Sequence, residues 1–254
     1  MADSAPGARA AADRQPLTIE AAIELLALGE IDVQGLLPWS SNYTFLVTVA
    51  RGDLRALAVY KPCRGERPLW DFPTGTLANR EVAAYLVSQV LGWMLVPPTV
   101  LRDGPHGVGM LQLYIHADPD EHYFTFGKQF PDQFRRLAAF DVLVNNADRK
   151  AGHCLRDDDD HVWAIDHGIC FHEEPKLRTV IWEFAGQPIP TDLLRDLRAF
   201  RQRLANRSDA ATKSLGKLLS REEATALRQR ADWLIAEARF PRPGPERHIP
   251  WPPV

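Results

Sequence analysis

The chain has 254 residues, of which 45% are hydrophobic and 25% are charged, a balance typical of a globular protein with one sizeable domain or two small lobes. Its formal net charge of −3 gives no support for a nucleic-acid or membrane-surface partner, because such partners usually call for a strongly basic balance. Three cysteines, an odd number without CxxC spacing, indicate reduced thiols in a cytoplasmic protein rather than a disulfide framework.

The N-terminal residues 1–16 contain Asp3 and no apolar run, so they do not have the pattern of a secretory signal, and we expect a disordered leader. The longest uncharged stretch, residues 82–101, is divided by Pro97 and Pro98 and is too short to span a membrane. We interpret it as a buried helix followed by a strand, and we expect no membrane span.

The first half of the chain, residues 17–115, has the pattern of a mostly-β lobe. Residues 17–30 show apolar side chains at helical spacing, with Thr18 placed to cap the helix, and residues 78–93 predict a second helix. Short segments rich in β-branched and aromatic residues predict strands at 31–39, 43–50, 54–62, 96–102 and 108–115.

The second half is mostly helical. After a polar and aromatic connector at residues 116–131, helical spacing returns, and two strand-like pieces interrupt it around Asp157–Asp160, four acids that favour a solvated turn over a cation site. Helices are predicted at 131–147, 190–206, 211–219 and 220–239. Residues 241–254 are too rich in proline for a helix or a central strand. We therefore expect an α+β, two-lobed chain with lobes at 17–115 and 132–240.

Two acidic motifs flank the predicted hairpin, Ala147-Asp148-Arg149 and Ile165-Asp166-His167-Gly168. Asp148 follows a helix and Asp166 ends the second strand of the hairpin, so both carboxylates are expected at one edge of a small sheet. Phosphoryl transfer from ATP uses such a pair, one to deprotonate a hydroxyl and one to hold Mg²⁺. Arg149 is expected either to neutralise phosphate charge or to brace the loop.

The first half supplies matching groups. Lys61 ends a strand where it would reach phosphates, and Glu81, twenty residues later, is placed to pair with it. The turn between the first two strands offers backbone N–H groups and polar side chains to phosphates, those of Ser40, Ser41 and Asn42, although it has no GxGxxG motif. Adenine is expected against the segment that contains Gln112, Leu113 and Tyr114.

These residues carry a family resemblance. The segments DVLVNNADRKAGHCL and VWAIDHG resemble the Asp-Arg-x-x-x-Asn and Asp-x-Gly motifs of phosphatidylinositol 3-/4-kinases and of bacterial HipA-like protein kinases. Together with LPWSSNYTFLVTV, AVYKP, WDFPTGTLANREVAAYLV and VPPTV, they make the chain similar to actinobacterial members of that superfamily. The resemblance covers roughly residues 30–240, and the order and spacing of the motifs both match.

The resemblance implies a two-lobed protein-kinase-like fold with ATP between the lobes. It makes Asp148 the catalytic base, Asp166 the metal ligand, and Lys61 with Glu81 the phosphate-binding pair. The metal-binding Asn of the family falls on His153, whose imidazole suits Mg²⁺ poorly.

Each residue also has a simpler interpretation: Asp148 as a helix end, Asp166 and Lys61 as polar strand ends, and Glu81 as a favourable charge in a first helical turn. A zinc site among His161, His167, His172 and Glu173 lacks the usual ligand spacing.

We expect a cytoplasmic, monomeric phosphotransferase that uses ATP and Mg²⁺, with Mn²⁺ as an alternative. Its acceptor is expected to be a hydroxyl of a protein or small molecule rather than a lipid, because Lys176 and Arg178 are the only cations in the segment that follows Asp166. Two alternatives stay open. One is a pseudokinase that regulates through nucleotide binding, and the other is a nucleotidyl transferase on the same fold.

Overall fold

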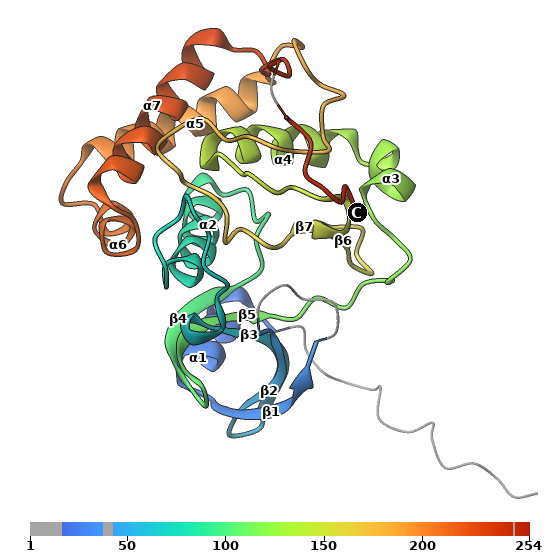
Figure 1. The fold of residues 1–254 in the computed structure, drawn as a ribbon, viewed down its shortest axis with the longest axis vertical. Helices are drawn as coiled ribbons and strands as arrows, with labels where there is room; N and C mark the ends of the chain where they lie inside the picture. The colour runs from blue at the N-terminus through green and yellow to red at the C-terminus, as the bar shows by residue number, and fades with distance from the viewer. Residues whose placement is uncertain (1–16, 38–42, 246) are drawn as a thin grey trace, which may run out of the picture.

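A five-stranded antiparallel sheet dominates the N-terminal part of the computed structural model, which describes residues 17–37, 43–245 and 247–254 (Figure 1). The strand order is β1-β2-β3-β5-β4, and the strands are β1 (Glu30–Leu36), β2 (Phe45–Arg51), β3 (Leu54–Pro62), β4 (Thr99–Gly104) and β5 (Gly107–Leu113). Alternating side chains such as Val47 and Val49 of β2 are fully buried, as expected for a sheet with one covered face.

Helix α1 (Ile19–Leu28) covers that face. The Thr18 side chain accepts a hydrogen bond from the Ala21 N–H at 3.2 Å and so caps the helix as predicted. Leu25 and Leu26 of α1 pack with buried residues of β2, β3 and β5 in a small core that is separate from the rest of the molecule. The sheet and α1 therefore form one compact unit.

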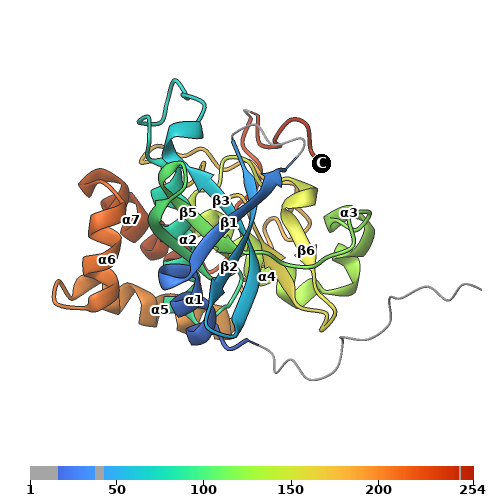
Figure 2. The same ribbon diagram turned by 90° about the horizontal axis from the view of Figure 1, so that it is seen from below.

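Helix α2 (Leu77–Leu91) lies between this unit and the helical part (Figures 1 and 2). It ends at Gly92, whose φ of 68° is the left-handed conformation that glycine adopts without strain. The buried apolar residues of α2, including Ala83, Ala84 and Val87, belong to the large core of the C-terminal part. The helix thus connects the two parts through packing as well as through the chain.

The C-terminal part is built around helices. They are α4 (Pro131–Val144), α5 (Thr191–Ala205), α6 (Ala210–Leu218) and α7 (Arg221–Glu237), with a short hairpin of β6 (Cys154–Arg156) and β7 (Val162–Ala164). Asp157–Asp160 form the turn of this hairpin: Asp157 accepts from two backbone N–H groups through Oδ1 and from the Trp163 indole through Oδ2. The mostly-β half followed by a mostly helical half agrees with the layout predicted from the sequence.

The stretch expected as a connector contains a short helix, α3 (Tyr123–Phe126). Tyr123 and Phe126 are buried in the large core against Phe134 of α4, so this stretch also contributes to packing. Residues 241–254 contain no helix or strand among those described and return along the helical part to the neighbourhood of β6 (Figure 1).

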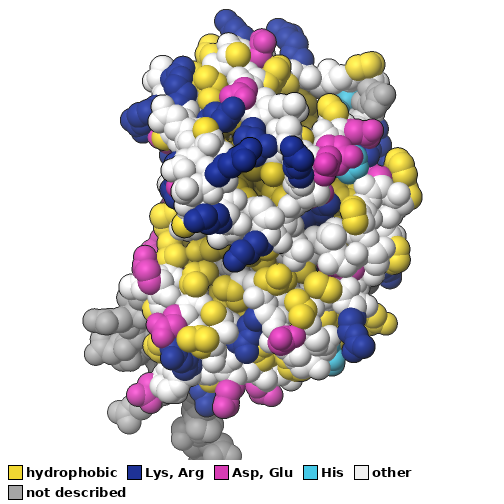
Figure 3. Space-filling view, turned by 90° about the vertical axis from the view of Figure 1, so that its left-hand side faces the viewer, with side chains coloured by type: hydrophobic (Ala, Val, Ile, Leu, Met, Phe, Trp, Pro, Cys, Tyr) yellow, Lys and Arg dark blue, Asp and Glu magenta, His cyan; other side chains and the backbone are white. Residues whose placement is uncertain are grey.

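The surface charge is uneven. In the upper half of the face shown in Figure 3, Lys and Arg side chains outnumber the acids. Helix α6 carries two exposed lysines, Lys213 and Lys217. The net charge of −3 therefore conceals a local excess of cations. None of the described helices is both long enough and apolar enough to cross a membrane.

Candidate active site

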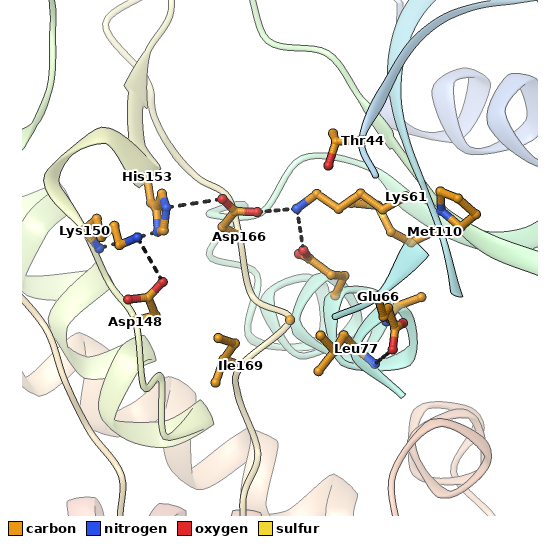
Figure 4. A pocket seen from close by; sticks show the side chains of 14 residues that line it. Thr44, Lys61, Glu66, Leu77, Met110, Asp148, Lys150, His153, Asp166 and Ile169 are labelled. Carbon is orange, nitrogen blue, oxygen red and sulfur yellow. Dashed lines mark hydrogen bonds and ion pairs between the residues drawn. The ribbon is translucent and has the colours of Figure 1, made fainter. Parts of the chain in front are cut away.

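A cavity of about 180 Å³ lies where the sheet, α2 and the loops of the C-terminal part meet (Figure 4). Its polar lining comes from residues far apart in the sequence: Thr44, Lys61, Glu66, Glu81, Asp148, Lys150, His153 and Asp166. A second cavity of about 530 Å³ adjoins it and shares Thr44, Lys61 and Asp166. The four residues to which the sequence assigned the chemistry, Lys61, Glu81, Asp148 and Asp166, thus line one site.

Lys61, at the end of β3, is held by two carboxylates. Its Nζ lies 2.8 Å from Glu81 Oε1 and also contacts Asp166 Oδ1. Glu81 is nearly fully buried, and its other oxygen accepts from the His167 N–H at 2.8 Å. Burial would lower the pKa of Lys61, but the two carboxylates outweigh this and raise the pKa above its ordinary value. A permanent positive charge therefore points into the cavity.

Asp166 has a backbone φ of 59°, in the left-handed region where Asp is one of the few tolerated residues. Desolvation would raise the pKa of its carboxyl, but the Lys61 ammonium outweighs it and holds the pKa well below its usual range. The side chain is 43% exposed and faces both cavities. It is therefore a permanent carboxylate at the boundary of the two cavities.

Asp148 lies in the loop after α4. The helix ends at Asn145, with φ 54°, and the side chain of Asn146 accepts from the Asp148 N–H at 2.9 Å. Lys150 Nζ lies 3.5 Å from Asp148 Oδ2. Burial raises the pKa of Asp148, and Lys150 opposes this rise. A carboxyl with a raised pKa is a better proton acceptor than an ordinary aspartate.

Arg149 is fully buried and lines neither cavity. Its guanidinium pairs with the buried carboxylate of Asp141 at 3.0 Å and donates to the carbonyl groups of His153 and Ile165 at 3.1 and 2.9 Å. These contacts fit the bracing role considered from the sequence, because Arg149 joins α4 to both loops of the site.

The segment predicted to contact adenine, Gln112, Leu113 and Tyr114, lines the larger cavity, but the side chain of Gln112 is engaged in a hydrogen bond elsewhere. Leu113 and Tyr114 line it beside Val59 of β3. Gln112 also lines it, but its side chain is buried and donates to Thr99 Oγ1 at 2.8 Å. The predicted phosphate contacts Ser40, Ser41 and Asn42 lie outside the described residues.

Sequence reasoning missed several residues of the site. Lys150, two positions after Asp148, was detectable from its adjacency to the motif. Glu66 was not detectable, because it lies in a loop outside the motifs and joins the site through hydrogen bonds to the backbone. Its carboxylate accepts from the N–H groups of Leu77 and Ala78 at 3.2 and 3.0 Å. Those amides begin α2, which lacks a side-chain cap of its own.

The described part of the chain contains no group of three or more His, Cys, Asp or Glu side chains arranged to hold a metal ion. His161 and His172 turn their rings to the carbonyl groups of Met94 and Asp71, respectively. A Mg²⁺ site usually takes one or two carboxylates from the protein, with phosphate and water oxygens completing the shell, and the carboxylates of Asp148 and Asp166 both line the smaller cavity.

Comparison with known proteins identifies the family. A family model described as phosphatidylinositol 3- and 4-kinase matches residues 75–208. Protein Rv2133c of Mycobacterium tuberculosis is 42% identical over 264 residues, which cover 90% of this chain and 94% of that protein. The chain belongs to the phosphatidylinositol 3- and 4-kinase family. Phosphatidylinositol 4-kinase gamma 4 of Oryza sativa subsp. japonica is 35% identical over 134 residues, 44% of this chain and 23% of the rice protein.

Solved structures show the same fold. The Golgi casein kinase with Mn/ADP bound has a TM-score of 0.55 at 14% identity and covers 87% of this chain and 75% of its own. A hydra Fam20 with sugar has a TM-score of 0.53 at 14% identity and covers 92% and 91%. The expected family resemblance and protein-kinase-like fold are confirmed, and the chain is a kinase-like phosphotransferase.

Proposed function

We propose that this protein transfers the γ-phosphoryl group of ATP to a hydroxyl group, with Mg²⁺ or Mn²⁺ held by Asp166. The observation that carries the proposal is the shared cavity, where a charge-fixed Lys61 and an ionised Asp166 face Asp148 (Figure 4). A metal ion would supply charge neutralisation for the phosphates. The Mn/ADP of the Golgi casein kinase structure supports nucleotide with a divalent cation on this fold.

Each residue has one role in this scheme. Lys61 contacts the phosphates and Glu81 holds its ammonium in place. Asp148 accepts the proton of the acceptor hydroxyl, for which its raised pKa suits it. Lys150, next to Asp148, offers a second cation to the transferring group. The nucleotide base occupies the larger cavity along Leu113 and Tyr114, between an N-lobe of residues 17–115 and a C-lobe of residues 132–240.

His153, in the place of the family's Asn, is proposed to position Asp166 rather than to bind metal. Its Nδ1 accepts from the Lys150 N–H at 3.4 Å, so the proton of the neutral ring lies on Nε2, 3.2 Å from Asp166 Oδ2. Burial lowers the pKa of His153 to about 4, which keeps the ring neutral. Nε2 therefore donates to the carboxylate and has no lone pair for a cation.

The acceptor is proposed to be a hydroxyl on a protein or small molecule. Of the two cations in the segment after Asp166, Lys176 is already paired with Asp71 at 2.9 Å, which weakens the case for a phosphorylated head group. Three free cysteines support a reducing, cytoplasmic compartment.

Thermal unfolding and label transfer test the proposal together. Mg²⁺-ATP at about 100 times its Kd should stabilise the wild type by about 2.7 kcal/mol, a rise in Tm of roughly 5 to 10 °C. The gain should vanish in Asp166→Asn. Asp148→Asn should keep the gain but lose transfer of γ-label to a lysate protein or metabolite. Asp158→Asn, in the exposed turn of the hairpin, is the control.

Three outcomes would contradict the proposal. An equal Tm gain in Asp166→Asn and the wild type would remove the metal role. ATP binding without any γ-label transfer would favour the nucleotide-binding regulator, which the His153 position motivates. Transfer of α-label instead of γ-label would make the protein a nucleotidyl transferase.

A further inference from the structure

Residues 248–254, which we call the tail strap, lie against the C-terminal part beside the loops of the site (Figure 1). The strap begins at His248, whose carbonyl accepts from the Thr179 N–H and from the Trp182 indole N–H, both at 3.0 Å. The rings of Trp182 and His248 meet edge to face, with centroids 5.7 Å apart. Trp182 thus anchors the start of the strap.

The far end of the strap holds the loop that carries Asp148. The Pro253 carbonyl accepts from the Ala151 N–H at 2.8 Å, and Ala151 is fully buried. A buried amide without an acceptor costs about 1 to 3 kcal/mol, so this hydrogen bond is a requirement of the loop conformation. Ala151 lies midway between Asp148 and His153, the two ends of the loop.

The other edge of the same loop is held by residues 178–180. The Arg149 N–H donates to the Arg178 carbonyl at 3.0 Å, and the Val180 N–H donates to the Arg149 carbonyl at 3.1 Å. Because Thr179 itself donates to His248, the loop lies between two segments that are also bonded to each other. The strap closes this arrangement.

Val254 reaches the larger cavity and lines it together with Leu113, Tyr114 and Asp166. The matched family region ends at residue 208, so the strap lies outside it. A segment beyond the family region thus supplies both a hydrogen bond to the loop and a wall of the proposed nucleotide cavity.

We infer that the tail strap is part of the active site. The Pro253 carbonyl is a positioning group that fixes the loop of Asp148 through Ala151, and Val254 limits the space available to the nucleotide. The second role rests on the proposed function, whereas the first follows from the contacts alone.

Hydrogen exchange separates the two roles from the proposed activity. In a chain that ends at Pro250, the Ala151 amide should exchange at least tenfold faster than in the full chain. Amides of β3 should keep their protection, which shows that the sheet is folded. Phosphoryl transfer at saturating ATP should fall at least tenfold.

The substitution Val254→Trp tests the wall. Val254 is 54% exposed, so the larger ring can be accommodated in the fold, but it should raise the Kd of ATP at least tenfold while Ala151 exchange stays unchanged. Unchanged exchange of Ala151 in the shortened chain would overturn the positioning role even if the protein proves not to be a kinase. If the wild type binds ATP and Val254→Trp leaves the Kd of ATP unchanged, the proposal that Val254 lines the nucleotide cavity would be overturned.

Discussion

The carboxyl of Asp148 is set between two opposing influences. Burial favours its protonated form, and the Lys150 ammonium favours its ionised form. A catalytic base must be ionised to accept a proton, so the balance between these influences decides how acidic the solution can become before activity is lost.

Lys150→Met should therefore move the acidic limb of the kcat/KM profile to higher pH. Removal of the cation leaves burial unopposed, the pKa of Asp148 rises, and a larger fraction of the enzyme is inactive at a given low pH. The measurement is the pH dependence of γ-label transfer from pH 4 to 8. Lys150→Arg keeps the charge and should leave the limb in place, and a limb that stays in place for Met as well would contradict the role of Lys150.

At the residue level, the sequence predicted which residues line the candidate site but not the contacts that surround them. Lys61, Glu81, Asp148 and Asp166 were predictable because each lies near the end of a predictable helix or strand, and the structure brings all four to one cavity. The environment of Arg149 was not predictable. The buried Arg149 guanidinium needs the buried carboxylate of Asp141 in α4 as its counter-ion. Which side chains meet in this way is determined by the packing of the helix against the loop, and the sequence motif does not show it.

Helix α4 holds the loop of Asp148 in place through one buried side chain, Asp141. The Asp141 carboxylate accepts from the Arg149 guanidinium and, at 3.0 Å, from the side-chain amide of Asn146. Asn146 in turn accepts from the Asp148 N–H. One carboxylate therefore orients both Arg149 and Asn146. The helix therefore determines the direction in which the loop leaves it.

Asp141→Asn should lower the free energy of unfolding by about 3 to 5 kcal/mol, because it leaves the buried Arg149 charge without its counter-ion. Urea unfolding measures the change. Asp132→Asn on the same helix is the matched control. The Asp132 side chain is 91% exposed and forms a surface ion pair with Arg135, so its loss should cost less than about 1 kcal/mol. Equal losses in the two variants would show that the buried pair contributes no more than a surface one.

Long elements were predictable because their periodicity repeats over several turns, as in α2, α4 and α7. The four-residue helix α3 was not, because so short a helix is stable only through contacts, here those of Tyr123 and Phe126 with Phe134. The path of the tail strap was equally hidden. A proline-rich segment has no periodicity, and its hydrogen bonds reach residues about 70 to 100 positions earlier in the chain.

At the scale of the whole molecule, the part of the chain that the structure describes packs into two hydrophobic cores of unequal size. The smaller one joins α1 to the sheet, and the larger one joins α2 to the C-terminal helices. Small cores provide less stabilisation, so the sheet is expected to open more readily than the helical part.

Leu26→Ala should destabilise the sheet by about 2 to 5 kcal/mol, since Leu26 is fully buried in the smaller core. Hydrogen exchange should accelerate in β2 and β3 far more than in α4 and α7. Leu28→Ala, two positions later in α1, removes a side chain that is 61% exposed and should change little. Equal acceleration in both parts would mean that the molecule unfolds as one unit.

The placement of α2 has a consequence for movement. Its apolar face belongs to the helical core, whereas Glu81 on the same helix holds Lys61 of the sheet. A tilt of the sheet away from α2 would therefore lengthen the Lys61–Glu81 ion pair. The distance between Lys61 and Glu81 would then indicate how far the two parts of the molecule have separated, and a nucleotide that contacts both parts would change this distance.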